Sequence, residues 1–186
     1  MIALVVLAII AIYFVITYNG LVSIKHNVEK AWANIDVLLK QRHDELPKLI
    51  DTCKQYMKHE QDTLEKVIQA RSRVSEARES QNVAALGSAE NALRSGLGQL
   101  FALAESYPDL KANEQFLQLQ SRISSLENAI ADRREFYNDS VNINNVRIEQ
   151  FPDLLVAKML NFKAAVLLKF AHEELKDIDV SQRFNG

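Results

Sequence analysis

The N-terminal segment of the chain, residues 2–18, reads IALVVLAIIAIYFVITY and contains no charged side chain. The first charged side chain after it is Lys25. An α-helix rises about 1.5 Å per residue, so this uncharged stretch can cross a hydrocarbon core about 30 Å thick. The sequence therefore predicts a transmembrane anchor over residues 1–24. The membrane-anchor residues are expected to be Ile2, Leu4, Val6, Ile9, Ile12, Phe14, Ile16 and Tyr18.

A cleaved signal peptide is the alternative to a retained anchor. Such a peptide has a basic start, a shorter apolar core and a small-x-small cleavage site. Here no basic side chain precedes the apolar run, and Tyr18-Asn19-Gly20 is a poor cleavage context. We therefore expect the anchor to remain in the mature protein.

The charges that follow the apolar run indicate how the chain is oriented. Basic residues lie close behind it, at Lys25, Lys30, Lys40 and Arg42. Positive charge near a transmembrane helix resists translocation, which predicts a short N-terminus outside and a body in the cytoplasm. Glu29 and Asp36 are interleaved with these residues, so a body on the external or periplasmic side is the alternative.

The composition of the remaining chain favours long helices. The 186 residues include only five Gly and three Pro, too few for the many turns of a β-sandwich or barrel. The 22 basic and 24 acidic residues are mixed along the chain, so no continuous basic stripe is available for nucleic acid. One cysteine cannot form an internal disulfide, which suits a reducing compartment.

Apolar residues recur at steps of three and four from Val28 to Ala77, with charged residues between them. This pattern predicts one long amphipathic helix continuous with the anchor and kinked at Pro47. Further helices are expected at about 83–105, 114–150 and 154–170, with Asn82 and Asn113 as N-caps. The predicted fold class is all-α, an antiparallel helical bundle over residues 25–170, followed by a polar tail over 171–186.

Three blocks of sequence resemble one known family. They are residues 28–42 (VEKAWANIDVLLKQR), residues 100–113 (LFALAESYPDLKAN), and residues 134–138 (REFYN) with Asn144 and Phe151-Pro152. Their order is similar to that of the LemA family of bacterial single-pass membrane proteins. The resemblance implies a helical bundle on an anchor in the bacterial cell (inner) membrane, with a short N-terminus outside and no settled biochemical activity.

The resemblance also singles out polar and turn residues in the body. They are Asn34, Arg42, Glu105, Tyr107, Pro108, Asp109, Lys111, Asn113, Arg134, Tyr137 and Asn138. We interpret them as structural rather than ligand-binding, with residues 107–113 forming a turn. Arg42 falls on the apolar face of its helix and needs a carboxylate partner, because an unpaired buried guanidinium is costly. Glu105 and Glu127 are the candidates.

No residue pattern indicates catalysis, a metal or a cofactor. Cys53 falls on the apolar face and is expected to be a buried thiol. The histidines, at positions 26, 43, 59 and 172, lack the paired spacing that places two imidazoles around zinc. We therefore expect a protein that is not an enzyme.

The later helices are too short to cover the predicted long helix. The apolar residues Val28, Trp32, Ile35 and Leu39 are therefore expected to form a bare seam near the membrane, unless the helix expected over 154–170 folds back or another protomer packs there. The seam predicts a non-catalytic scaffold that self-assembles into a homo-oligomer in the membrane plane. The alternative is an adaptor or regulatory subunit for another membrane protein, such as a protease or signalling protein. The expected partners are thus the lipid bilayer, further copies of the chain, and a possible membrane protein.

Overall fold

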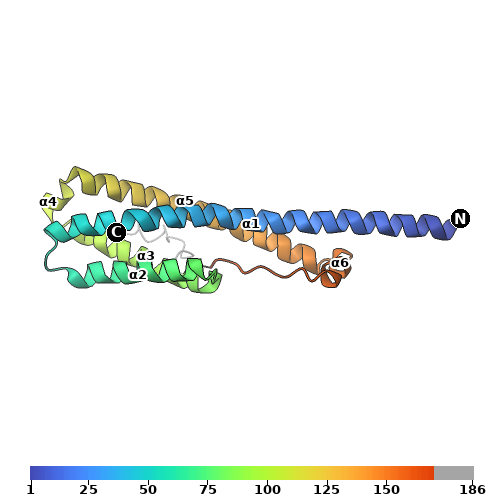
Figure 1. Cartoon of the computed structure of the whole chain (residues 1–186). Coiled ribbons are helices and arrows are strands. Elements are labelled where there is room, and N and C mark those ends of the chain that lie inside the picture. The colour runs from blue at the N-terminus through green and yellow to red at the C-terminus, as the bar shows by residue number, and fades with distance from the viewer. Residues whose placement is uncertain (170–186) are drawn as a thin grey trace, which may run out of the picture. The chain divides into compact units, whose positions relative to one another are not determined.

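The computed structural model describes residues 1–169, and these residues form helices with no strand among them (Figure 1). The all-α prediction is therefore confirmed. The helices are α1 (Ile2–Tyr56), α2 (Gln61–Glu79), α3 (Val83–Ala104), α4 (Pro108–Lys111), α5 (Glu114–Glu149) and α6 (Asp153–Met159).

The chain divides into two compact units, whose boundaries fall inside α1 and α5. The first unit consists of residues 1–42 and 123–167, and the second of residues 43–122 with Leu168 and Lys169. The predicted division at residues 24 and 170 stays a prediction. The tail over 171–186 lies outside the described residues.

In the first unit, α1 and α5 run antiparallel. Arg42 of α1 contacts Glu127 of α5, and the Trp32 ring packs on the Tyr137 ring with centroids 5.6 Å apart. Nearer the N-terminus, α6 joins them. A small apolar core there consists of Leu21, Ile148, Val156 and Ala157, with Phe14 and Phe162 packed against it.

The second unit is built around the pair α2 and α3, which lie side by side (Figure 1). The side chain of Asn82 caps α3 by accepting a hydrogen bond of 3.0 Å from the Ala85 amide, as predicted. The two helices approach closely at Gly96, where a Cβ would lie 3.3 Å from a methyl carbon of Val67. A Cβ at this position would be closer than an ordinary van der Waals contact, so the Val67 side chain would have to shift by a few tenths of an ångström.

The prediction of one unbroken helix from the anchor to Ala77 is wrong, because α1 ends at Tyr56 and α2 begins at Gln61. The apolar pattern continues through the break, since Met57 and Leu64 are buried on either side of it. Apolar periodicity indicates which side chains are buried. It does not reveal the break, because α1 and α2 each bury their apolar side chains up to it. Pro47 lies inside α1 without ending it.

The predicted helix over 154–170 is also wrong. Helix α6 ends at Met159, and Asn161 then adopts a positive φ of 56°. The chain beyond it is extended and bonds to side chains of α5. The Asn145 side chain accepts from the Ala165 amide (2.8 Å) and donates to the Ala165 carbonyl (3.0 Å), while Tyr137 donates to the Val166 carbonyl (2.9 Å). These bonds satisfy backbone groups that a helix would otherwise pair internally.

Candidate functional site

The first part of α1 exposes apolar side chains on every side. Among the described residues, α1 is the one helix long and apolar enough to cross a membrane. The predicted anchor residues range from 83% exposed at Ile2 to 42% at Tyr18, except that Phe14 is half-buried. A helix that is apolar all round and exposed to its surroundings is typical of a membrane span.

Polar contacts join this apolar segment to the start of α6. The Tyr13 hydroxyl donates to Asp153 Oδ1 over 3.0 Å, and the Thr17 hydroxyl donates to the same oxygen over 3.4 Å. Arg147 of α5 forms an ion pair with the other carboxylate oxygen. Thr17 and Asp153 are buried, at 2% and 8% exposed. We name these four residues the Asp153 cluster.

Sequence reasoning missed the Asp153 cluster. The signal present in the sequence is a pair of hydroxyl-bearing residues four positions apart, Tyr13 and Thr17, within an otherwise apolar run. Residues with this spacing share one face of a helix, so they mark the face that meets a polar partner. The partner itself lies far along the chain, and no local pattern identifies Asp153.

The buried Arg42 finds its carboxylate in Glu127, one of the two candidates. Arg42 Nη1 donates to Glu127 Oε1 over 2.6 Å, and the two side chains are 1% and 16% exposed. The other candidate, Glu105, forms an ion pair with Lys111 at the surface. The pair between Arg42 and Glu127 is thus a buried structural contact within the first unit.

The turn residues hold the end of the second unit together. Asn113 caps α5 by accepting from the Phe116 amide (2.9 Å), as predicted, and its side-chain amide donates to the Tyr56 hydroxyl (3.0 Å). The Tyr107 hydroxyl donates to Glu60 Oε1 (3.1 Å). Burial and this contact with Glu60 raise the pKa of Tyr107. Pro108 starts the short helix α4, with Asp109 in its first turn.

The remaining polar residues of the predicted set lie along α1 and α5. Tyr137 is buried between Trp32 and the extended chain, and burial raises the pKa of its hydroxyl. Arg134 and Asn138 flank it on α5 and are half-buried, whereas Asn34 of α1 is exposed. These positions do not converge on one pocket.

The seam that was expected to be bare is covered within the chain, so that prediction is wrong. Ile35 and Leu39 are 0% and 1% exposed, and Val28 and Trp32 are half-buried. The seam was expected to be bare because the later helices are too short to cover a helix that runs to Ala77. Helix α1 instead ends at Tyr56. Helix α5 therefore reaches along the part of α1 that was expected to lie open.

A different apolar stripe is exposed, on the outer face of α5. Phe136, Ile143 and Val146 are 54%, 57% and 50% exposed, and their spacings of seven and three place them on one helical face. We call these three residues the α5 stripe. Sequence reasoning assigned α5 an apolar face but did not separate this outer stripe from the buried one.

Cysteine and histidine are the side chains that would first suggest a reactive or metal-binding site. Cys53 is fully buried as predicted, and burial raises the pKa of its thiol to about 12. The described residues contain no group of three His, Cys, Asp or Glu side chains that could hold a metal ion. His59 is exposed, His26 contacts Glu29, and His172 lies outside the described residues.

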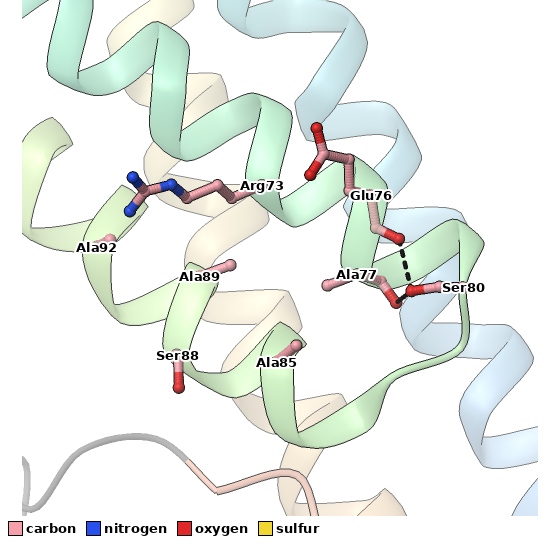
Figure 2. Close-up of a pocket in the computed structure, with 8 residues that line it drawn as sticks. All are labelled: Arg73, Glu76, Ala77, Ser80, Ala85, Ser88, Ala89 and Ala92. Carbon is pink, nitrogen blue, oxygen red and sulfur yellow. Dashed lines mark hydrogen bonds between the residues drawn. The ribbon is translucent and has the colours of Figure 1, made fainter.

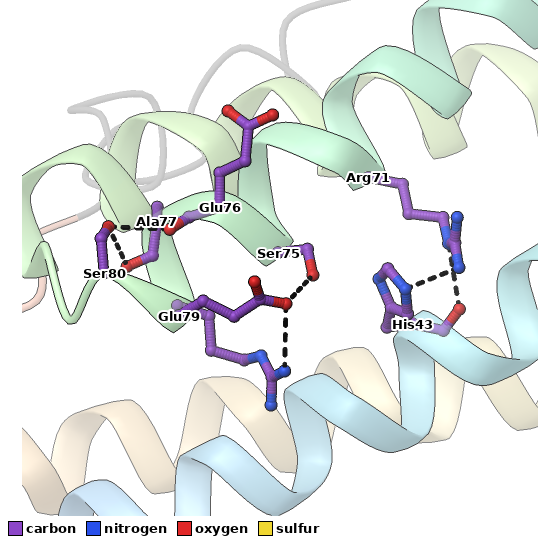
Figure 3. Close-up of polar contacts among 8 residues, drawn as sticks. His43, Arg71, Ser75, Glu76, Ala77, Glu79 and Ser80 are labelled. Carbon is purple, nitrogen blue, oxygen red and sulfur yellow. Dashed lines mark hydrogen bonds and ion pairs between the residues drawn. The ribbon is translucent and has the colours of Figure 1, made fainter.

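His43 makes a contact that the sequence did not reveal (Figure 3). Arg71 of α2 donates from Nη2 to His43 Nε2 over 2.6 Å and from Nε to the His43 carbonyl over 3.1 Å. The ring therefore accepts through Nε2 and is neutral. Burial and then the Arg71 charge lower the pKa of His43.

A cavity of about 400 Å³ lies between α2 and α3 (Figure 2). Its lining consists of Arg73, Glu76, Ala77, Ser80, Ala85, Ser88, Ala89 and Ala92. The Ser80 hydroxyl donates to the Glu76 and Ala77 carbonyls, and the Arg73 and Glu76 side chains point apart. The lining therefore does not present a nucleophile paired with a base.

Comparison with known proteins identifies a family and several relatives of this sequence. The LemA family matches residues 31–182. Protein LemA of Metamycoplasma hominis is 29% identical over 168 residues, which cover 90% of this chain and 75% of that protein.

Magnetosome proteins of the MamQ type match a shorter segment. MamQ 2 of Paramagnetospirillum magneticum is 31% identical over 81 residues, covering 44% of this chain and 30% of that protein. MamQ of Magnetospirillum gryphiswaldense is 29% identical over 90 residues, covering 48% and 32%. The match spans about a third of the MamQ proteins. Together with the apolar helix, these relatives indicate a membrane-associated protein.

Proposed function

The chain belongs to the LemA family, and on that premise we propose that it is a non-catalytic, membrane-anchored scaffold that self-assembles into a homo-oligomer in the membrane plane. The observation that carries this proposal is the α5 stripe, an exposed apolar face on the same compact unit as the anchor. Exposed apolar patches commonly mark association surfaces.

The anchor is supported by the exposure of apolar side chains over residues 2–18. Burial of apolar area contributes about 25 cal/mol per Å², so leaving Ile2, Leu7 and Ile16 in water, each at least 65% exposed, is costly. A bilayer removes that cost. Retention of the anchor is supported by the Asp153 cluster, because cleavage after the apolar run would remove Tyr13 and Thr17, both of which bind Asp153.

Self-association is supported by geometry common to all copies. Anchored copies share one orientation, so the α5 stripe of each lies at the same level relative to the membrane. Confinement to a plane also raises the local concentration of copies, which favours weak apolar contacts. The body is proposed to lie in the cytoplasm, on the side of Lys25 and Lys30.

The proposal is tested by the mass of the purified protein in nanodiscs. We expect particles many times larger than the 21.1 kDa protomer for the parent chain. The double change Phe136→Asp and Ile143→Asp places charges on the stripe and is expected to reduce the particles to protomers.

Gln41→Glu provides the matched control, because it adds a negative charge at an exposed position of α1 in the same compact unit, outside the stripe. Its particle size should equal that of the parent. A parent chain that runs at the protomer mass would contradict the scaffold. Co-purification of a distinct membrane protein with such a protomer would instead favour the adaptor function. Trp32 belongs to the seam first expected to mediate self-association, but Trp32→Asp is a poorer test. Trp32 packs on Tyr137, so its loss would disturb the fold.

A further inference from the structure

We infer that α6 and the residues on either side of it lie within the leaflet from which α1 leaves the membrane, with their exposed apolar face in contact with lipid. The inference rests on the proposed anchoring of α1, and it adds a second membrane-binding element to a chain whose sequence indicates one.

The first argument concerns depth along α1. A span of about 20 residues is needed to cross the hydrocarbon core. Every window of that length that fits between Met1 and Lys25 includes both Tyr13 and Thr17. These two side chains bind Asp153, the first residue of α6. Helix α6 is therefore level with the membrane-spanning part of α1 and not with the body beyond it.

The second argument concerns the surface of α6, which is apolar on opposite faces. Val156 and Ala157 are 5% and 1% exposed and pack in the core with Leu21 and Ile148. Leu155 and Met159, four residues apart, face outward and are 61% and 65% exposed. An element that is apolar on its free face as well as its packed face is typical of lipid contact.

The same apolar surface continues before and after the helix. Phe151 is 76% exposed and Leu160 is 41% exposed. Tyr18 and Phe162 form an edge-to-face pair with ring centroids 6.5 Å apart. Tyrosine is enriched at the level of the lipid headgroups. Lys158 and Lys163 are exposed in this region and can reach lipid phosphates from the end of α6.

The third argument concerns the charges at this depth. An ionised carboxylate within a membrane is costly unless it is paired and hydrogen-bonded. Asp153 meets both conditions through Arg147, Tyr13 and Thr17. The Asp153 cluster thus compensates the charge at the one acidic residue of α6 and fastens the helix to the anchor.

Lipid fits this surface better than a second copy of the chain. The exposed apolar residues belong to an element that is bonded to the apolar segment of α1 through Tyr13 and Thr17, so an occupant that surrounds the anchor also reaches α6. A second copy would have to cover this surface while both copies remain inside the same leaflet. A bilayer covers both surfaces at once.

The depth of single tryptophans in brominated vesicles tests the inference. The chain has one tryptophan, Trp32, so a Trp32→Phe background allows one reporter at a time. Three reporters on exposed apolar positions of the first unit are compared: Leu155→Trp on α6, Ile9→Trp in the anchor, and Val37→Trp in the body. The full-length variants are reconstituted in phosphatidylcholine and phosphatidylglycerol vesicles with brominated acyl chains.

We expect Ile9→Trp and Leu155→Trp each to lose about half or more of their fluorescence relative to unbrominated vesicles, and Val37→Trp to keep nearly all of it. Quenching of Ile9→Trp without quenching of Leu155→Trp would overturn the inference and leave the anchor intact. In that case, a disulfide between copies carrying Leu155→Cys would identify a second copy as the occupant.

Failure of the proposed function gives a different result. If the chain is not anchored, neither Ile9→Trp nor Leu155→Trp is quenched, and the protein does not float with the vesicles. If the chain is anchored but does not self-assemble, quenching is as expected while the particle mass in nanodiscs equals that of the protomer. Circular dichroism of each variant confirms that the helices are retained.

Discussion

Two stretches of the single helix α1 are built for different surroundings. Over residues 2–18 the side chains are apolar on every face, and Thr17 is the one that is fully buried. Over residues 31–53 a stripe that includes Ala31, Ile35 and Leu46 is buried, and the charged residues other than Arg42 and Glu45 lie outside it. The same backbone therefore serves two environments, and the distribution of side chains around the helix distinguishes them.

The comparison shows that exposure alone does not measure instability. Ile12 is 60% exposed and Ile35 is 0% exposed, yet each suits its surroundings if the first lies in lipid and the second in a packed core. Charge follows the same division, since α1 carries none before Lys25 and carries a buried arginine at position 42.

The buried charge of the body gives the largest expected effect. Arg42→Ala leaves the Glu127 carboxylate without its buried partner, and we expect the free energy of unfolding to fall by about 3–5 kcal/mol. Chemical unfolding in detergent, followed by circular dichroism, measures this loss. The double change Arg42→Met with Glu127→Leu should recover much of it, because apolar groups then replace the pair. A loss below about 1 kcal/mol for Arg42→Ala would show that the pair behaves like an exposed ion pair.

A matched pair of substitutions sharpens the comparison within α1. Ile35→Ala removes a fully buried side chain from the core, with an expected loss of about 2–5 kcal/mol. Ile12→Ala removes the same atoms from an exposed position, with an expected change within about 0.5 kcal/mol. The same unfolding measurement applies to both. Equal losses would mean that residues 2–18 are packed against protein rather than lipid.

The pH-dependent contribution of His43 to the stability of the folded chain gives the smallest expected effect. Burial and Arg71 lower the pKa of His43, so the folded chain holds the ring neutral while the unfolded chain takes up a proton near pH 6.5. Its stabilising effect is therefore full above pH 6.5 and declines as the pH falls below it.

His43→Gln tests this effect, because it keeps a side-chain acceptor for Arg71 without a titrating group. The melting temperatures of parent and variant are measured between pH 7 and pH 5. The amount by which the parent exceeds the variant should become smaller toward acid pH. The carboxylates are common to both proteins and cancel in that difference. A constant difference across the range would show that His43 does not titrate with unfolding.

Local patterns in the sequence were sufficient to predict much of the fold. The helix α3 and the caps at Asn82 and Asn113 follow from apolar periodicity and from side chains that accept backbone hydrogen bonds. The pairing of Arg42 followed from its place on an apolar face, although the choice between Glu105 and Glu127 needed the structure.

The features that escaped prediction depend on contacts between distant residues. The break after Tyr56 is invisible to periodicity, because residues on both sides of it are buried. The early end of α6 depends on Asn145 and Tyr137, which bond to the chain that follows it. The Asp153 cluster joins residues 140 positions apart along the chain. A single sequence contains no local signal for such pairings.

The place where α6 meets α1 has a consequence for other helices in the same bilayer. Residues 2–12 of α1 precede the first contact with Asp153 and rise about 16 Å, roughly half of the hydrocarbon thickness. If α6 is embedded as inferred, neighbouring transmembrane segments can approach α1 from any direction in the far leaflet. In the near leaflet the side carrying Tyr13 and Thr17 is occupied, so lateral partners are restricted to the remaining directions.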